Sequence, residues 1–159
     1  MTFDDWILAL HVLAAFSLVA GLIVFWVLIA AVRRTDTPGD TLSMAPMTKV
    51  ASAAIGIGAI GTIVFGIWLA FSVGGYDIWD GWIIAAIVLW AIAMAVGQRT
   101  NAAYMVGVNK ALELQRTGLS GPDPDLLAAN RTSNGLLLQT LASIVIVLLL
   151  IDMIWKPGA

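Results

Sequence analysis

The chain has 159 residues, of which 60% are hydrophobic and only 11% are charged, and its formal net charge is −2. A soluble domain usually carries about 25% charged residues, so this composition is typical of a protein whose solvent is largely lipid. The chain contains no cysteine, which excludes disulfides, thiolate metal sites and cysteine nucleophiles. Its length suits a single domain.

The first apolar segment covers residues 6–32, which is long enough to cross about 30 Å of hydrocarbon as one helix. Acidic residues precede it, whereas a cleavable signal peptide begins with basic residues, so we expect the segment to stay in the membrane. His11, the only histidine, lies one to two turns inside this span. Mostly small residues share its helical face, which predicts that the imidazole points into the helix bundle.

Residues 50–71 form the second apolar segment, after a connection that contains Pro38, Gly39 and Pro46. The segment includes the letters G-x-G-x-x-G at 56–61, but this fingerprint binds dinucleotides only between a strand and a helix, so we expect no nucleotide site here. Small residues at four-residue spacing instead predict close approach of a neighbouring helix, from the same chain or from a second copy. They are Ala54, Gly58, Thr62, Gly66 and Ala70.

The third and fourth apolar segments cover residues 82–97 and 136–155. The chain between them contains no strong helix breaker until the third connection, and Asp123 followed by Pro124 is typical of a helix N-terminus. We therefore predict a helical hairpin at about 98–135 that extends some 20 Å beyond the membrane. Its second arm is expected to run directly into the fourth span.

The fourth span carries the polar residues Gln139, Ser143 and Asp152. We expect Gln139 and Ser143 to point inward, where they form a candidate polar path or hydrogen bonds between helices. Asp152 lies on roughly the opposite helical face and near the end of the span, so its carboxylate is expected to reach water. By its depth, however, Asp152 could also meet His11 inside the bundle and extend the polar path.

The distribution of basic residues predicts the orientation of the bundle. Of the eight Lys and Arg residues, only Lys156 lies outside the first and third connections and their flanks. Because basic connections stay in the cytoplasm, we predict an all-α, up-down-up-down bundle of four spans in a bacterial plasma membrane, with both termini outside. The outer face would then be acidic and aromatic, through Asp4, Asp5, Trp6, Tyr76, Asp77, Trp79, Asp80, Trp82 and Trp155.

An intramembrane histidine such as His11 can hydrogen-bond to another helix, ligate haem iron or relay a proton. The leading interpretation is an inter-helix hydrogen bond, because a lone histidine cannot build a multi-histidine metal site. The sequence has no Ser-His-Asp triad, P-loop or H-E-x-x-H motif, and nothing in it supports nucleic-acid binding. Basic residues at the membrane boundary predict contacts with anionic lipid, or else a docking surface for a soluble partner.

Short motifs along the chain resemble an uncharacterised bacterial four-helix integral membrane family. They are Leu10-His11-Val12-Leu13-Ala14-Ala15, Gly61-Thr62 with Gly66, Asp80-Gly81-Trp82 and Met153-Ile154-Trp155-Lys156-Pro157-Gly158. That family looks related to copper-resistance D-like membrane domains and, more distantly, to the membrane protoporphyrinogen oxidase that binds haem b. The resemblance implies that His11 is a possible haem b ligand. Leu18 stands where that family usually has a tryptophan, and Lys110 lies too far along the third helix for the second-site lysine of the oxidase.

Three functions are consistent with these observations. The leading one is a non-enzymatic membrane component that works as a homo-oligomer or as a subunit of a larger membrane complex, with no cofactor. The second is a transporter or channel for a small solute or metal ion. The third is a haem-binding redox protein that uses His11.

The predicted orientation can be measured with reporters fused to the chain. A reporter that is active only in the cytoplasm should work when inserted near Thr37 or Ser120 and should fail when fused after Ala159. A reporter that is active only outside the cell should give the reverse pattern. Cytoplasmic activity of the fusion after Ala159 would show that the orientation is wrong.

Overall fold

Local sequence signals set the helix boundaries in the computed structural model, which describes residues 2–73 and 77–156. Thr2 and Asp5 form a capping box, in which each side chain accepts a hydrogen bond from the other's backbone N–H. Asp123 accepts a 2.7 Å hydrogen bond from the Leu126 backbone N–H, and Pro124 occupies the first turn, so the predicted helix start is confirmed. The helices are α1 (Phe3–Val32), α2 (Pro38–Ser43), α3 (Ala45–Ser72), α4 (Gly81–Arg116), α5 (Pro124–Asn130) and α6 (Ser133–Trp155).

Four helical segments are long and apolar enough to cross a membrane, which confirms the four spans expected from the sequence. They are Phe3–Val32, Pro38–Ser72, Gly81–Arg116 and Pro124–Trp155. Large apolar side chains are exposed along all four, as expected for surfaces that face lipid rather than water. Tyr76, assigned to the outer face on sequence grounds, lies outside the described residues.

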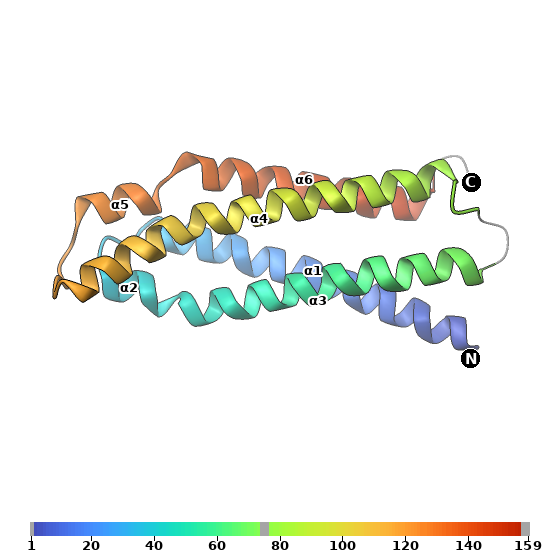
Figure 1. The fold of residues 1–159 in the computed structure, drawn as a ribbon, viewed down its shortest axis with the longest axis horizontal. Coiled ribbons are helices and arrows are strands. Elements are labelled where there is room, and N and C mark those ends of the chain that lie inside the picture. The colour runs from blue at the N-terminus through green and yellow to red at the C-terminus, as the bar shows by residue number, and fades with distance from the viewer. Residues whose placement is uncertain (1, 74–76, 157–159) are drawn as a thin grey trace.

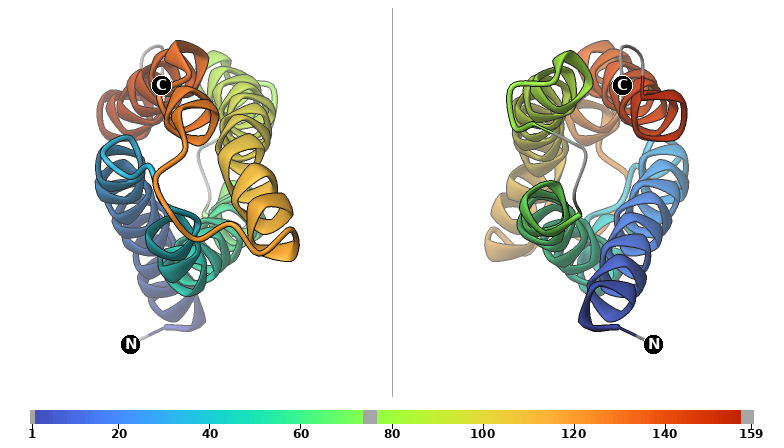
Figure 2. Two further views of the ribbon diagram at one scale, coloured as in Figure 1. Left: turned by 90° about the vertical axis from the view of Figure 1, so that its left-hand side faces the viewer. Right: turned by 90° about the vertical axis from the view of Figure 1, so that its right-hand side faces the viewer.

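The long helices form two close pairs. α1 packs along α3 and α4 packs along α6, whereas α3 and α4, and likewise α1 and α6, approach each other less closely. We call α1 and α3 the first pair, and α4 and α6 the second pair. Figure 1 shows that the pairs lie side by side along the whole molecule, and the end-on views of Figure 2 show the order α1, α3, α4, α6 around the bundle.

The two ends of the bundle differ in structure. α1 begins and α6 ends at one end, which we call the termini end, whereas α2 and α5 lie at the opposite end (Figure 1). At that opposite end α2 packs against α4, as does α5, and Ala111, Leu114 and Leu126 form a small apolar core there. The first arm of the predicted hairpin, at the end of α4, is therefore covered by α2 as well as by α5, which belongs to the hairpin's own second arm.

Glycines bring the backbones of the first pair together. A Cβ atom added to Gly58 of α3 would overlap the backbone nitrogen of Leu18 and would lie 2.7 Å from the Ala14 carbonyl oxygen of α1. On the other side of the contact, a Cβ atom at Gly21 would lie 2.9 Å from the backbone oxygen of Ala51. The helix that approaches the small-residue stripe is therefore α1 of the same chain.

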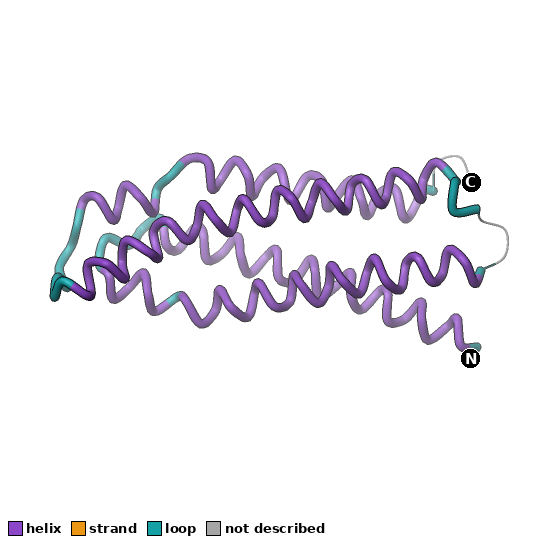
Figure 3. The backbone as a smooth tube through the Cα atoms, viewed as in Figure 1, coloured by secondary structure: helices purple, strands orange, loops and turns teal. Residues whose placement is uncertain are grey.

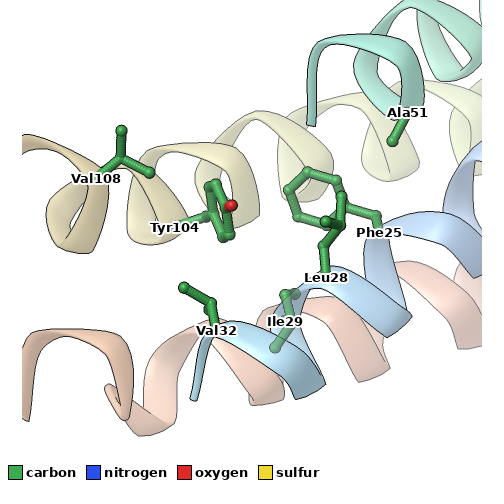
Figure 4. Packing of buried hydrophobic residues seen from close by; sticks show 7 residues of the cluster. All are labelled: Phe25, Leu28, Ile29, Val32, Ala51, Tyr104 and Val108. Atoms are coloured by element: carbon green, nitrogen blue, oxygen red, sulfur yellow. The ribbon is translucent and has the colours of Figure 1, made fainter. Parts of the chain in front are cut away.

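Large side chains fill the wider space between the pairs. In the half that holds α2 and α5, the Tyr104 ring of α4 lies 5.6 Å from the Phe25 ring of α1, and Ala51 and Val108 join the same cluster (Figure 4). Nearer the middle of the bundle, all four long helices contribute to a second cluster, which contains Leu18, Ala59, Ala93, Val145 and Ile146. The two clusters thus fill the space between the pairs, the first with the aromatic rings of Phe25 and Tyr104 and the second with aliphatic side chains.

Two features of the connections differ from the predictions. The second arm does not run directly into the fourth span, because α5 ends at Asn130 and α6 begins at Ser133 (Figure 3). The backbone leaves the helical region at Thr132 (φ −49°, ψ 121°), and the Thr132 hydroxyl donates to the Ala129 carbonyl at the end of α5. Pro46, expected to lie in a connection, lies in the first turn of α3, where the missing N–H of proline costs no helical hydrogen bond.

The contact through Gly58 can be tested with a matched glycine in the same helix. Gly58→Ala should lower the free energy of unfolding by about 1–3 kcal/mol, because the neighbouring atoms belong to the rigid backbone of α1. Gly56→Ala should leave that free energy unchanged or raise it, since no atom lies within 4 Å of the added Cβ atom. Denaturation in detergent followed by circular dichroism measures both, and equal stabilities would contradict the packing described.

Candidate functional site

His11 lies on the face of α1 that meets α3. Its imidazole rests on the bare backbone of Gly66, since a Cβ atom there would lie 3.0 Å from Cε1 and 3.4 Å from Nδ1 of His11. Its Nδ1 atom is buried and has no hydrogen-bond partner among the described residues. The small residues of α3 therefore make room for the imidazole in the first pair.

The stripe of small residues on α3 has two parts. Gly58 and Thr62 are buried, and the Thr62 hydroxyl donates to the Ala59 carbonyl of its own helix. Ala54, Gly66 and Ala70 are half-buried. The Ala54 carbonyl accepts a 3.0 Å hydrogen bond from the Ser17 hydroxyl of α1. The stripe thus combines close backbone approach with one polar tie inside the first pair.

Gln139 and Ser143 of α6 face α1. The Gln139 side chain is only 2% exposed, and its Nε2 donates to the Leu22 carbonyl at 3.4 Å. One turn further along, Ser143 Oγ accepts a 2.8 Å hydrogen bond from Trp26 Nε1 and itself donates to the Gln139 carbonyl. Both side chains are therefore used as ties between the two pairs.

Asp152 is only 8% exposed and Oδ2 of its carboxylate is buried, so this side chain is less open to water than the sequence predicted. The reason is that α6 is covered on two faces, by α1 near Gln139 and by α4 beyond it. Asp152 shares a helical face with Lys156, whose ammonium lies 5.3 Å from the centroid of the Trp82 ring of α4. Trp82 was expected in the exposed aromatic belt, but it is buried at 7% exposure.

The proposed path through Gln139, Ser143 and Asp152 is not continuous in the structure. Gln139 and Ser143 bond to α1, whereas Oδ2 of Asp152 is buried without a hydrogen-bond partner among the described residues. No hydrogen bond between described residues joins Asp152 to His11. The two buried, unpaired atoms, His11 Nδ1 and Asp152 Oδ2, thus belong to different helix pairs.

A buried polar cluster that the sequence analysis missed joins the first and third connections. Asn130 at the end of α5 donates through Nδ2 to the Thr35 carbonyl at 3.1 Å, to the Thr35 hydroxyl at 3.2 Å and to the Thr41 hydroxyl at 3.1 Å. Thr41 is fully buried and Asn130 is 8% exposed. The Asn130 amide also contacts Gly107, where a Cβ atom would overlap it.

Two arginines surround this cluster with reciprocal bonds. Arg33 donates to the Arg131 carbonyl at 2.8 Å, and Arg131 Nε donates to the Arg33 carbonyl at 3.2 Å. The Asp123 backbone N–H donates to the Asp36 carbonyl at 2.8 Å, which adds a third link between the same two connections. We call the interacting residues Arg33, Thr35, Asp36, Thr41, Asp123, Asn130 and Arg131 the clasp, and the end of the bundle that holds it the clasp end.

A small cavity lies between the clasp and the bundle core. It measures about 20 Å³ and is lined in part by Arg33, Thr100, Tyr104, Asn130 and Thr132. A cavity of this size holds about one water molecule, and its polar lining offers that molecule hydrogen-bond partners. It is far too small for a nucleotide, a haem or another organic ligand.

Metal-binding and charged groups are sparse in the described part of the chain. Within it, no three His, Asp or Glu side chains come together in a group that could hold a metal ion. Its one ion pair joins Lys110 and Glu113 of α4 at 3.4 Å. The other basic side chains near the clasp end are exposed or half-buried, as expected for groups that meet solvent or lipid headgroups: Arg33, Arg34, Lys49, Arg99, Arg116 and Arg131.

No protein-family model, no curated protein and no solved structure matches the chain. The geometry above therefore carries the functional argument.

Proposed function

We propose that this chain is a non-enzymatic component of a bacterial plasma membrane, which acts as a homo-oligomer or as a subunit of a larger membrane complex. In the proposed orientation the clasp end faces the cytoplasm and both termini lie outside. The distribution of Lys and Arg supports this orientation, since seven of the eight lie on the side of the first and third connections.

The hydrogen bonds that the intramembrane polar side chains make between helices are the main support for this proposal. Ser17, Trp26, Trp90, Gln139 and Ser143 each donate or accept a hydrogen bond between two helices. Polar groups in lipid need such partners, and here they connect the helices to each other rather than converge on a ligand. The bundle interior has room at the clasp for one water molecule, which suits a framework better than a catalytic site.

The outer surfaces suit a protein that binds lipids and other membrane subunits. Large apolar side chains cover the spans, and Trp6, Trp79 and Trp155 are exposed near the termini end, where aromatic rings sit well at headgroup level. The exposed basic residues near the clasp end would contact anionic lipid of the cytoplasmic leaflet.

The assembly state is the direct test of the proposal. We expect native mass spectrometry of the chain, extracted together with its surrounding lipid, to show several copies or a stoichiometric partner subunit. The same state should persist when the lipid-to-protein ratio is raised, because a specific assembly survives dilution in the membrane. A single copy without a partner at every ratio would contradict the proposal.

Two buried atoms favour the alternative functions. The unpaired Nδ1 of His11 could ligate a haem iron, which is the basis of the redox alternative. The unpaired Oδ2 of Asp152 could bind a proton or a cation inside the membrane, which is the basis of the transport alternative. Both alternatives make His11 or Asp152 essential for an activity, whereas the leading proposal gives them structural roles.

Substitution of His11 separates these functions. His11→Gln should keep most of the thermal stability in detergent, because the Gln amide can donate and accept hydrogen bonds next to α3. His11→Leu, the matched apolar control, removes the buried Nδ1 atom that lacks a hydrogen-bond partner, so it should be no less stable than His11→Gln. A Soret band in the purified parent protein that His11→Gln abolishes would support the haem alternative. Proton-coupled flux in proteoliposomes that a folded His11→Gln protein loses would support transport.

A further inference from the structure

Two arginines of the clasp are held together without an acidic partner. Arg33 is the C-cap of α1 and Arg131 is the C-cap of α5, and the carbonyl groups at helix C-termini attract cations. Each arginine donates to the backbone carbonyl of the other. Among the described residues neither forms an ion pair, and the nearby Asp123 carboxylate caps α5 instead. Two positive charges therefore lie on adjoining backbone segments with only carbonyl dipoles to balance them.

Most hydrogen-bond donors of the two guanidinium groups are not used by the chain. An arginine side chain has five N–H groups. The bonds of Arg33 use only its Nη1 atom, which donates to the carbonyls of Arg131 and Thr132, and the bond of Arg131 uses only Nε. Arg33 is half-buried and Arg131 is exposed, so their other N–H groups are open to an external acceptor. Guanidinium groups bind phosphate oxygens especially well, through pairs of parallel hydrogen bonds.

An exposed, mostly apolar strip leads from these arginines along the line where α1 and α6 meet. The two helices are neighbours in the end-on views of Figure 2, and Trp26 Nε1 joins them by its bond to Ser143. Arg33 follows Trp26 by seven residues, which is about two turns of helix. Residues three or four positions away lie on the same side of a helix, and here they are exposed. They are Ile23 and Ala30 of α1, and Thr140 and Val147 of α6.

We call Trp26, Ser143 and these four exposed residues the seam. The seam offers few free polar groups, because the Thr140 hydroxyl donates to the Leu136 carbonyl of its own helix. The apolar segment of α1 ends directly before Arg33, and the fourth apolar segment begins at residue 136, five positions after Arg131. The arginines therefore lie at the level of lipid headgroups, while the seam lies within the hydrocarbon.

We propose that Arg33 and Arg131 bind the phosphate group of one anionic phospholipid, whose acyl chains lie along the seam. The phosphate neutralises both guanidinium groups and adds a link between the end of α1 and the start of the second pair. This inference rests on the contacts with anionic lipid in the proposed function. It does not depend on the number of copies in the assembly, which the assembly test measures separately.

Lipid titration of the delipidated full chain in a neutral detergent tests the site. Native mass spectrometry should show one molecule of phosphatidylglycerol per chain, bound about tenfold more tightly than phosphatidylcholine, whose cationic headgroup meets two arginines. Equal affinities for the two lipids would overturn the proposal. Phosphatidylglycerol should also raise the melting temperature, whereas millimolar inorganic phosphate should not. An equal rise with inorganic phosphate would show a site for a soluble anion and no role for the seam.

Charge-matched variants separate a specific site from general attraction. Arg131→Gln should weaken phosphatidylglycerol binding about tenfold, because it removes the paired donors. Arg99→Gln removes the same charge from an exposed arginine of α4 near the end of the third span, and should weaken binding by less than about twofold. Equal losses in both variants would overturn the site but leave general contacts with anionic lipid, and hence the proposed function, intact.

A clasp variant that keeps both arginines controls for structural damage. Thr41→Val removes a hydroxyl that accepts from Asn130. It should lower the melting temperature yet change the affinity for phosphatidylglycerol by less than about twofold, because the two arginines are unaltered. A loss as large as that of Arg131→Gln would show that the arginines act only through the clasp. If Arg131→Gln does not fold, Arg33→Lys keeps the charge but loses the paired donors, and an unchanged affinity would then overturn the proposal.

Discussion

The contact between the backbones of α1 and α3 determines how the rest of the bundle is arranged. Because Gly58 lies directly against the backbone of α1 at Leu18, these two helices come closer than side chains on both faces would allow. Dispersion between the two helices, rather than the hydrophobic effect, then supplies the attraction in lipid. The remaining helices pack beside this pair at larger separations, where tryptophan and tyrosine rings fill the space.

The length of the polar side chains that join two helices follows the distance between those helices. Where helices are close, a short side chain such as Ser17 reaches the opposite backbone, at Ala54. Where helices are further apart, the bonds need long side chains, so Trp26, Trp90 and Gln139 make them. At the clasp end, where water is near, a larger set of side-chain and backbone bonds takes over this role.

The length and periodicity of the apolar segments predicted the four spans. Small residues at every fourth position predicted the close-packed face of α3, which includes Gly58. Local signals also located the helix start at Asp123. The clasp could not be predicted, because Thr35 and Asn130 are 95 positions apart in the chain and neither has an unusual local context. The burial of Asp152 was missed for a related reason: a helical wheel shows which residues share a face, but not that α6 has neighbours on two faces.

The close pairing of α1 with α3 also has a consequence for biosynthesis. Every residue of that contact precedes Ser72, so the first pair can assemble in the membrane before α4 has been inserted. The second pair cannot be joined to it at the clasp until Asn130 and Arg131 leave the ribosome, when only the last span remains to be inserted. The order of the helices in the chain therefore favours one order of assembly, in which the first pair forms in the bilayer before the second pair joins it.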